Sequence, residues 1–266
     1  MATLTSPDSD RYALITGATS GIGAEFTRQL ASTGYNVVIV ARDKSRLDSM
    51  ADDLRAHTGV AVEILVADLT DAQQRESVEN RLASLEKPIS YLVNNAGYGL
   101  PQDFDRNSIA DEHKMLDVLA TVPMRLSHAA LGGMLLRRSG TILTVASLAG
   151  EAPLGLYSAA KAWPMSFSRW ANAHYKHRGV TFTALAPGFV KTEFHSRLGI
   201  ERESMAPRWM WLEAPFLVRS ALRTARRKRA VSIPSVRYKL VWLLMKIGQP
   251  VILLFVARAS RRSNGL

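Results

Sequence analysis

Tyr157 and Lys161 are the residues of this chain whose types and spacing are best suited to chemistry. They bracket the segment Tyr-Ser-Ala-Ala-Lys, and Ser147 precedes Tyr157 by ten residues. Residues four apart lie on one face of a helix. An ammonium held beside a phenol lowers the pKa of the phenol, so this pair predicts an acid or base that works near neutral pH.

A glycine-rich segment, Thr-Gly-Ala-Thr-Ser-Gly-Ile-Gly, occupies residues 16–23. It follows an apolar run from Tyr12 to Ile15 and opens a helical pattern. At such a turn, backbone N–H groups at the positive end of a helix can bind a pyrophosphate. Together with Tyr157 and Lys161, the segment predicts a hydride-transfer site served by a dinucleotide.

The elements that must position these groups alternate along the chain. Buried strands of one parallel sheet are predicted for the β-branched apolar runs at 12–16, 36–41, 61–67, 90–93, 141–146, 180–186 and 230–233. Helices are predicted over 21–33, 44–57, 72–85, 109–137 and 157–177. Right-handed crossovers between these elements give a doubly wound, Rossmann-like α/β fold of about seven strands, with its cleft at the carboxyl ends of the strands.

The length of 266 residues suits one such domain with an appendage. Residues 1–10 are predicted to be a polar lead-in, because they lack the basic and apolar regions of a secretory signal. The domain is predicted to span 11–235, with an irregular segment at about 189–215 as a lid over the substrate. A basic and apolar tail, 236–266, completes the chain.

These motifs resemble those of the classical short-chain dehydrogenase/reductase family, over the stretch from about Tyr12 to Pro234. Besides the glycine turn and the Ser147, Tyr157 and Lys161 set, three more segments match in the right order. They are Asp68-Leu69, Asn94-Asn95-Ala96-Gly97, and Pro187-Gly188 followed by Thr192. The resemblance implies that Tyr157 is the general acid in reduction and the base in oxidation. Ser147 would bond the substrate carbonyl, and Lys161 would hold the nicotinamide ribose.

The resemblance also implies a set of cofactor contacts. The expected residues are Gly17, Thr19, Ser20, Gly21, Ile22, Gly23, Arg42, Asp68, Leu69, Asn95, Ala96, Gly97, Tyr157, Lys161, Pro187, Gly188, Val190 and Thr192.

The end of the second predicted strand bears on the choice of cofactor. An acidic side chain there would accept a hydrogen bond from the ribose 2′-hydroxyl and repel a 2′-phosphate. The strand ends Val40-Ala41-Arg42, and an arginine is suited to phosphate. NADP(H) is therefore predicted, with NAD(H) as the alternative. Asp43 could make an acidic contact, pair with a cation or cap the next helix.

The family has a catalytic asparagine in its long central helix, and alignment of Met115 to Val118 puts Leu119 in that place. In the family, the backbone carbonyl at this position binds a water that links the active-site lysine to solvent. Pro123 lies four residues after Leu119 and lacks the N–H that would bond the Leu119 carbonyl. We therefore hypothesise that a proline-imposed kink replaces the asparagine.

The charge of the chain is very unevenly placed. The whole sequence has 34 Lys or Arg and 23 Asp or Glu, a net charge of +11, but 12 of the basic residues and none of the acidic ones lie in 214–266. The preceding part therefore has 22 basic and 23 acidic residues and is nearly neutral. Within the tail, Lys246 and a Gly-Gln-Pro break at 248–250 interrupt an apolar stretch and disfavour a membrane span. The tail could pack on its own lid or on a neighbouring subunit, lie on an anionic membrane surface, or bind nucleic acid, which is disfavoured.

The sequence excludes disulfides and thiolate metal sites, because it has no cysteine. No metal-ligand spacing is found, and a cytoplasmic location is predicted, with a peripheral place on the membrane as an option.

The function predicted is NADP(H)-dependent interconversion of a carbonyl and a secondary alcohol on an apolar, lipid-like substrate, by a homo-oligomer. Apolar residues expected near the cleft are Phe104, Leu148, Leu154, Leu156, Trp209 and Trp211. The alternative is a catalytically weak NADP-binding sensor or scaffold at a membrane surface.

Overall fold

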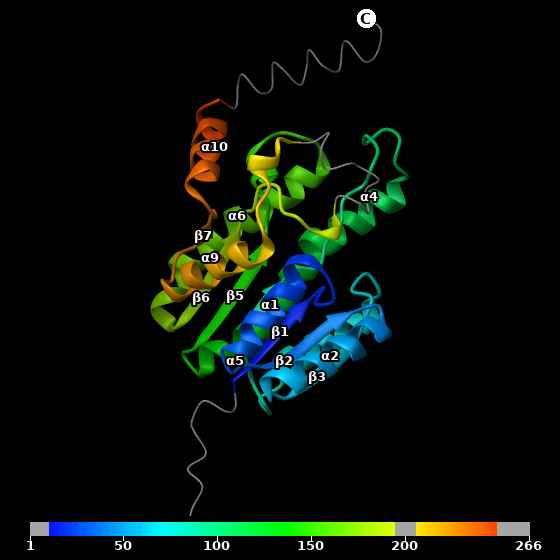
Figure 1. Ribbon diagram of the computed structural model, residues 1–266, viewed down its shortest axis with the longest axis vertical. Helices are drawn as coiled ribbons and strands as arrows, with labels where there is room; N and C mark the ends of the chain where they lie inside the picture. Colours follow the sequence, from blue (N-terminus) through cyan, green and yellow to red (C-terminus); the bar gives the residue numbers. More distant parts are fainter. Residues whose placement is uncertain (1–10, 195–205, 249–266) are drawn as a thin grey trace, which may run out of the picture.

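A computed structural model describes residues 11–194 and 206–248 of the chain. Its centre is a seven-stranded sheet with the order β3-β2-β1-β4-β5-β6-β7, in which each pair of neighbours is parallel (Figure 1). The strands are β1 (Tyr12–Thr16), β2 (Asn36–Ala41), β3 (Val62–Val66), β4 (Ile89–Asn94), β5 (Gly140–Val145), β6 (Val180–Leu185) and β7 (Val231–Ser232). The predicted doubly wound α/β fold is confirmed.

Helices connect the strands and cover both faces of the sheet. They are α1 (Gly21–Ser32), α2 (Lys44–Thr58), α3 (Ala72–Ala83), α4 (Ile109–Leu116), α5 (Val122–Leu136), α6 (Leu156–Tyr175), α9 (Ala214–Arg226) and α10 (Val236–Ile247). Short helical turns lie at η1 (Asp117–Thr121), η2 (Leu148–Glu151), η3 (Lys176–Arg178) and η4 (Arg208–Met210).

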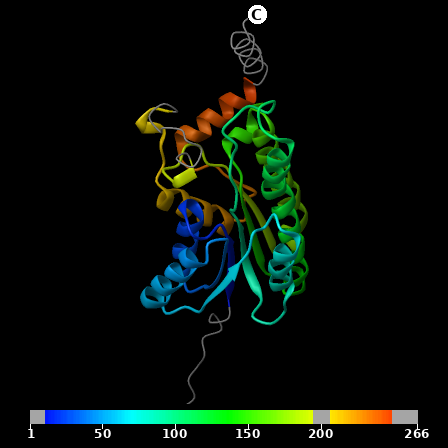
Figure 2. The ribbon, with the colours of Figure 1, turned by 90° about the vertical axis from the view of Figure 1, so that its right-hand side faces the viewer.

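Two buried apolar layers hold the helices on the sheet. Phe26 of α1, Leu47 of α2 and Leu217 of α9 belong to the layer on one face. Val78 of α3 and Leu126 of α5 belong to the layer on the other. Figure 2 shows the blue, light-blue and orange helices on one side of the sheet and the green helices on the other. Both faces of each central strand are therefore buried, which is why the strands are nearly continuous apolar runs.

The strand order reverses at β1, which lies between β2 and β4. The chain leaves β1 for one face of the sheet and leaves β4 for the other, so the carboxyl ends of these two strands border a crevice. In open α/β sheets this switch point is where ligands bind. The glycine turn follows β1, and the Asn94 to Gly97 motif begins at the end of β4.

Two elements differ from the sequence expectations. The helix expected over 109–137 is interrupted by η1, a π-helical turn at Asp117–Thr121. A helix that was not predicted, α9, begins inside the expected lid and ends at Arg226, the first of four consecutive basic residues. It buries Leu217, Val218, Ala221, Leu222 and Ala225 at helical spacing. The basic residues between them obscured this period in the sequence.

The expected lid is only partly visible, because residues 195–205 lie outside the described ranges. Outside them as well are the lead-in, 1–10, and the last part of the tail, 249–266. Among the helices that the structure does describe, none combines the length and the apolar character that crossing a bilayer requires.

Candidate active site

The glycine turn after β1 is packed so closely that side chains are excluded from it. Gly17 has φ +63°, and a Cβ on it would lie 2.9 Å from Asn95 Nδ2. A Cβ on Gly23 would lie 2.1 Å from the carbonyl oxygen of Gly17. The backbone of the turn is thus held against the end of β4, and its outer side can approach a ligand closely.

The start of α1 fits the pyrophosphate of a dinucleotide. Within the described chain, the N-cap residue Ser20 makes no side-chain capping bond, so the N–H groups of the first turn are left for a ligand. Thr19 and Ser20 are half-buried, and Ile22 packs on the core. Thr192, from the loop after β6, approaches to 3.1 Å of the Cβ position of Gly21. The predicted contacts from the two loops are therefore brought together.

Thr16, which the sequence analysis did not single out, joins the ends of β1 and β4. Its buried hydroxyl oxygen accepts hydrogen bonds from the backbone N–H groups of Asn95 and Ala96, both at 3.0 Å. Asn95 Nδ2 donates in return to the carbonyl oxygen of Thr16 at 2.9 Å. A threonine that ends a strand just before a glycine turn is the signal that could have indicated this role.

At the end of β2, Arg42 extends into solvent with a side chain that is 75% exposed. Its Nη1 lies 3.7 Å from Oδ2 of Asp68. Although burial acts to raise the pKa of Asp68, hydrogen bonds from Thr70 and the charge of Arg42 lower it below the ordinary value. Leu69 is buried in the core beneath this pair. A cation and an anion are thus both available near the expected adenosine site.

Asp43 caps α2 and also pairs with a cation, Arg46, whose Nε lies 3.9 Å from Asp43 Oδ2, so it fulfils two of the three alternatives left open for it. Its Oδ1 accepts a hydrogen bond from the backbone N–H of Arg46 at 3.1 Å. Arg46 in turn pairs with Glu193, at 3.3 Å, from the segment after Thr192. The carboxylate of Asp43 is therefore used by the helix, and Arg42 is the residue that extends from the strand end.

Tyr157 and Ser147 meet at the carboxyl end of β5. Tyr157 is in the first turn of α6, and Ser147 caps η2, with its Oγ accepting from Ala149 N at 3.1 Å. The two hydroxyl groups are hydrogen-bonded to each other. Burial raises the pKa of Tyr157 to about 12, and the bond from Ser147 opposes that rise in part. The phenol of Tyr157 is therefore neutral near pH 7, and its hydroxyl lies beside that of Ser147.

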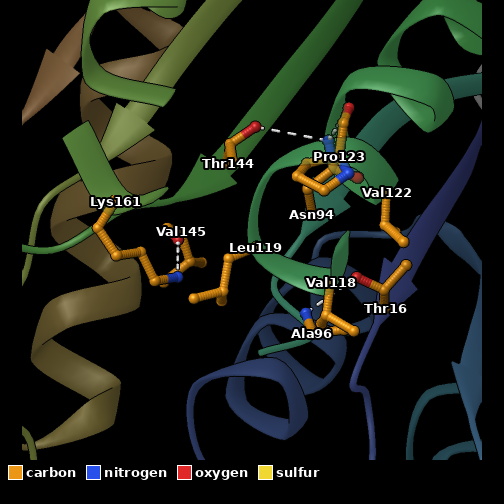
Figure 3. Close-up of a pocket in the computed structure, with 10 residues that line it drawn as sticks. All are labelled: Thr16, Asn94, Ala96, Val118, Leu119, Val122, Pro123, Thr144, Val145 and Lys161. Carbon is orange, nitrogen blue, oxygen red and sulfur yellow. Dashed lines mark hydrogen bonds between the residues drawn. The ribbon is translucent and has the colours of Figure 1, made fainter. Parts of the chain in front are cut away.

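Lys161 lies one helical turn after Tyr157, and its side chain is buried, with 6% exposed. Its Nζ donates to the carbonyl oxygen of Val145 at 2.7 Å (Figure 3). The same atom lies 6.0 Å from the centroid of the Tyr157 ring. Burial lowers the pKa of Lys161 to about 8. The expectation that Lys161 brings the pKa of Tyr157 below its ordinary value is wrong for this structure, because burial of the phenol outweighs the other effects.

Leu119 is buried in the π-helical turn and faces the lysine. Only 3% of it is exposed, and it packs with Met115 and Ala160. A Cβ on Gly97 would lie 2.8 Å from Leu119 Cδ2 and 3.7 Å from Lys161 Nζ, so the glycine gives both side chains their room. The turn ends two residues before Pro123, whose missing N–H removes the usual partner of the Leu119 carbonyl. The helix is thus irregular at the position where Pro123 led us to expect a kink.

Asn94 borders a cavity of about 10 Å³ together with Leu119 and Lys161, the room of about one water molecule (Figure 3). Its Nδ2 donates to Ser127 Oγ at 3.1 Å and to Thr144 Oγ1 at 3.4 Å. Its Oδ1 is buried and has no hydrogen-bond partner within the described residues. An acceptor is thus available near the lysine, and the sequence analysis had assigned Asn94 no role of its own.

Tyr238 of α10 fixes the loop that follows β6. Its hydroxyl accepts from Phe189 N at 2.9 Å and donates to Met210 O at 2.7 Å. A Cβ on Gly188 would lie 2.0 Å from the Tyr238 ring, so Gly188 is required by this contact. Pro187 and Val190 are buried beside it. The loop expected to face the nicotinamide is thus held from behind by the tail.

Replacing Tyr238 with phenylalanine is expected to lower the free energy of unfolding by about 1–3 kcal/mol, because two partly buried hydrogen bonds, one from an N–H and one to a carbonyl, are lost. Urea unfolding followed by circular dichroism would measure the difference. Gly188→Ala is the matched second variant, since its methyl group would displace the same ring. An unfolding free energy unchanged in both variants would contradict this role of Tyr238.

The apolar residues expected near the cleft are divided between surface and core. Phe104, Leu154 and Trp209 are exposed. Leu148 is buried in the core, as is Trp211, whose Nε1 donates to Ala206 O at 3.1 Å. Leu156 packs beside Tyr157, and the ring of Phe194, which was not predicted, lies 6.2 Å from that of Tyr157. Leu148 and Trp211 therefore stabilise the fold under the cleft.

Comparison with known proteins identifies the family. The model described as "short chain dehydrogenase" matches residues 11–203. The chain belongs to the short chain dehydrogenase family. Its members are oxidoreductases that act on CH–OH and C=O groups, so the predicted family and enzyme class are confirmed.

Individual relatives agree with this assignment. A very-long-chain 3-oxoacyl-CoA reductase of Anas platyrhynchos is 36% identical over 70% of this chain and 62% of its own length. The inactive hydroxysteroid dehydrogenase-like protein 1 of Homo sapiens is 32% identical over 68% of this chain and 56% of its own. The chain thus spans about three fifths of these curated relatives.

Among solved structures, a short-chain dehydrogenase from Sphingobium yanoikuyae in complex with NADPH has a TM-score of 0.82 and 33% identity. The match covers 95% of each chain. A nicotinamide dinucleotide as the cofactor of this family member is therefore supported by a relative of the same length and fold, in addition to the glycine turn of the chain itself.

Proposed function

We propose that this protein is an NADP(H)-dependent oxidoreductase that interconverts a carbonyl and a secondary alcohol on an apolar, lipid-like substrate. The observation that supports it best is the hydrogen-bonded pair of hydroxyls, Ser147 and Tyr157, beside the buried ammonium of Lys161. The pair lies beyond the carboxyl end of β5, and the glycine turn follows the carboxyl end of β1, so both lie at the same edge of the parallel sheet. Carbonyl reduction needs a general acid, a hydroxyl that orients the substrate oxygen, and a binding site for the dinucleotide. Tyr157, Ser147 and the glycine turn fit these three roles.

In this mechanism each side chain has a separate task. Ser147 orients the substrate oxygen with a hydrogen bond, and Tyr157 donates its proton to that oxygen as negative charge develops. Lys161 stabilises the phenolate that remains, since its ammonium is close and shielded from water. A bound dinucleotide would supply or accept the hydride. Gly17, Gly23 and the N–H groups of α1 would hold its phosphates.

The preference for NADP(H) is proposed from Arg42, whose guanidinium can bond a phosphate through two N–H groups. Arg42→Ala is expected to lower kcat/KM with NADPH by about 10- to 100-fold, the value of a charged hydrogen bond, and to leave kcat/KM with NADH unchanged. Steady-state kinetics with both cofactors would measure this. Arg55→Ala, an exposed arginine at the far end of α2, is the control. Equal losses with both cofactors would contradict the assignment.

The apolar substrate is proposed from two sources. Phe104, Leu154 and Trp209 are exposed, and Leu156 packs beside Tyr157. The relatives named above act, by name, on very-long-chain 3-oxoacyl-CoA or resemble hydroxysteroid dehydrogenases. Long acyl chains and steroids share a large apolar body with a ketone, and exposed apolar side chains are suited to binding such a body.

The decisive experiment is NADPH oxidation by the purified chain against a panel of 3-oxoacyl, steroid, aromatic and short aliphatic ketones. We expect turnover with NADPH, and a kcat/KM that rises with the apolar area of the ketone. Turnover of short polar ketones alone would overturn the apolar substrate. Absence of turnover on every compound, with NADPH still binding, would overturn the enzyme and favour the second candidate.

The second candidate is a catalytically weak NADP-binding sensor or scaffold protein. Leu119 favours it, because a buried apolar side chain stands where the family has its asparagine. One relative is itself described as inactive. The intact Ser147, Tyr157 and Lys161 favour the enzyme.

Leu119→Asn distinguishes the two candidates. If the π-helical turn and Pro123 have replaced the asparagine, the variant is expected to change kcat by less than about threefold, since no missing group is restored. A rise of orders of magnitude would show that the native site is deficient. Leu119→Met, of similar volume, controls for repacking of the buried position.

The surroundings of the enzyme are proposed from the sequence. We place it in the cytoplasm, as a homo-oligomer built on its central helices. α10 packs on its own lid through Tyr238, so part of the tail contacts the same chain.

A further inference from the structure

Helix α10 has two apolar faces, and the described residues of the chain pack against one of them. Tyr238 is buried, and Val241 and Trp242 pack against the core. Five other apolar residues of the helix are exposed to solvent. Their exposed fractions are 80% for Val236, 57% for Leu240, 48% for Leu243, 60% for Leu244 and 73% for Ile247. Single exposed apolar residues are common, but five on one helix form a patch of the kind that marks an interaction surface.

The five residues form one stripe, the α10 stripe. Their spacing of four, seven, eight and eleven residues from Val236 places them on one side of a helix with 100° per residue. The packed residues lie on the opposite side by the same count. The stripe therefore points away from the body of the protein along the whole described helix.

Basic residues border the α10 stripe on both flanks. Arg237 lies on one side of it by helical position, and Lys239 and Lys246 lie on the other, all three exposed. From 214 to 266 the chain has 12 basic residues and no acidic one. Long basic side chains beside an apolar stripe can reach phosphates at the level of the lipid headgroups while the stripe enters the acyl region.

This charge pattern decides between two occupants of the stripe. In a symmetric contact with a second copy, α10 would meet itself, and the three basic residues would face their own equivalents. Glu151, the acid beside Lys246, is already bonded to Arg169 and Trp242 of its own chain. A bilayer that contains anionic lipid offers both the apolar interior and the opposite charge. Each basic residue near such a surface raises partitioning by about fivefold.

We propose that the α10 stripe docks into the surface of an anionic phospholipid bilayer. The docked helix lies at the active-site end of the molecule, because Trp242 Nε1 bonds Glu151 of η2 at 3.1 Å and Tyr238 holds the loop after β6. Figure 2 shows α10, in red-orange, across that end of the sheet. Delivery of an apolar substrate from the membrane to the cleft rests on the proposed function, whereas the docking itself does not.

The test is co-sedimentation of the full chain with vesicles of phosphatidylcholine and phosphatidylserine at 3:1, and with vesicles of phosphatidylcholine alone. We expect binding to the anionic vesicles, and weaker binding to the neutral ones. Leu240→Glu/Leu244→Glu should lower binding by about tenfold or more for each substitution. The matched control, Leu85→Glu/Leu136→Glu, changes two leucines that are somewhat more exposed, 66% and 76%, by the same charge.

Circular dichroism would show that both double variants are folded, and no destabilisation is expected because the four side chains are exposed. Equal binding by the native chain and Leu240→Glu/Leu244→Glu would overturn the proposal. So would loss of a dimer in that variant, seen by light scattering, without loss of vesicle binding. Turnover of a water-soluble ketone without vesicles reports on the proposed function separately.

Discussion

Tyr157→Phe is expected to lower kcat for ketone reduction by about 10²–10⁴-fold, the range that a positioned general acid contributes. The variant loses one oxygen atom, the one hydrogen-bonded to Ser147, and keeps the ring that packs beside Leu156. NADPH affinity should change little, because the glycine turn and Arg42 are untouched. NADPH oxidation measures the first effect, and quenching of protein fluorescence on NADPH binding measures the second.

Tyr91→Phe is the control, because it also removes one phenolic hydroxyl from a buried tyrosine, in this case in strand β4. The Tyr91 hydroxyl has no hydrogen-bond partner within the described residues, so its loss leaves nothing unpaired. Activity and stability should therefore match those of the native chain or improve on them. A Tyr157→Phe variant as active as Tyr91→Phe would show that the proton comes from another group.

The sheet was predictable because its strands are buried on both faces. Such strands are continuous apolar runs bounded by glycine or polar residues, and β1 and β2 were predicted to the residue. Helix α9 was missed for the opposite reason. It has apolar residues on one face only, and its exposed face contributes to the basic segment 214–266, which was examined for its charge and not for a helical period.

For the site, spacing predicted which residues meet but not the environment that they meet in. Tyr157 and Lys161 share a helix face because they are four residues apart. The pKa of Tyr157 depends on burial, which tertiary packing decides, and it moved in the direction opposite to the expectation. Gly188 was assigned to the cofactor from its motif, yet the space that its Cβ would occupy is filled by the ring of Tyr238, fifty residues later. Contacts between distant segments leave no local pattern.

Lys161→Met is the second variant for which a large effect is expected. It should lower kcat/KM for reduction by about 10²–10⁴-fold, because the phenolate form of Tyr157 loses the only cation that the described structure places beside it. Methionine keeps most of the length of the buried side chain and removes a charge that burial disfavours, so the fold should persist. Lys176→Met, an exposed lysine at the far end of α6, is the control and should match the native chain.

The pH profile distinguishes this electrostatic role from simple positioning. Burial lowers the pKa of Lys161 to about 8, so the ammonium is charged below that pH and neutral above it. Since the charged form stabilises the phenolate left by proton donation, the rate of reduction in the native chain should fall as pH rises through about 8. The residual activity of Lys161→Met should lack this fall. If the fall persists there, another group titrates, and Lys161 acts through its contact with Val145 and the shape of the site rather than through its charge.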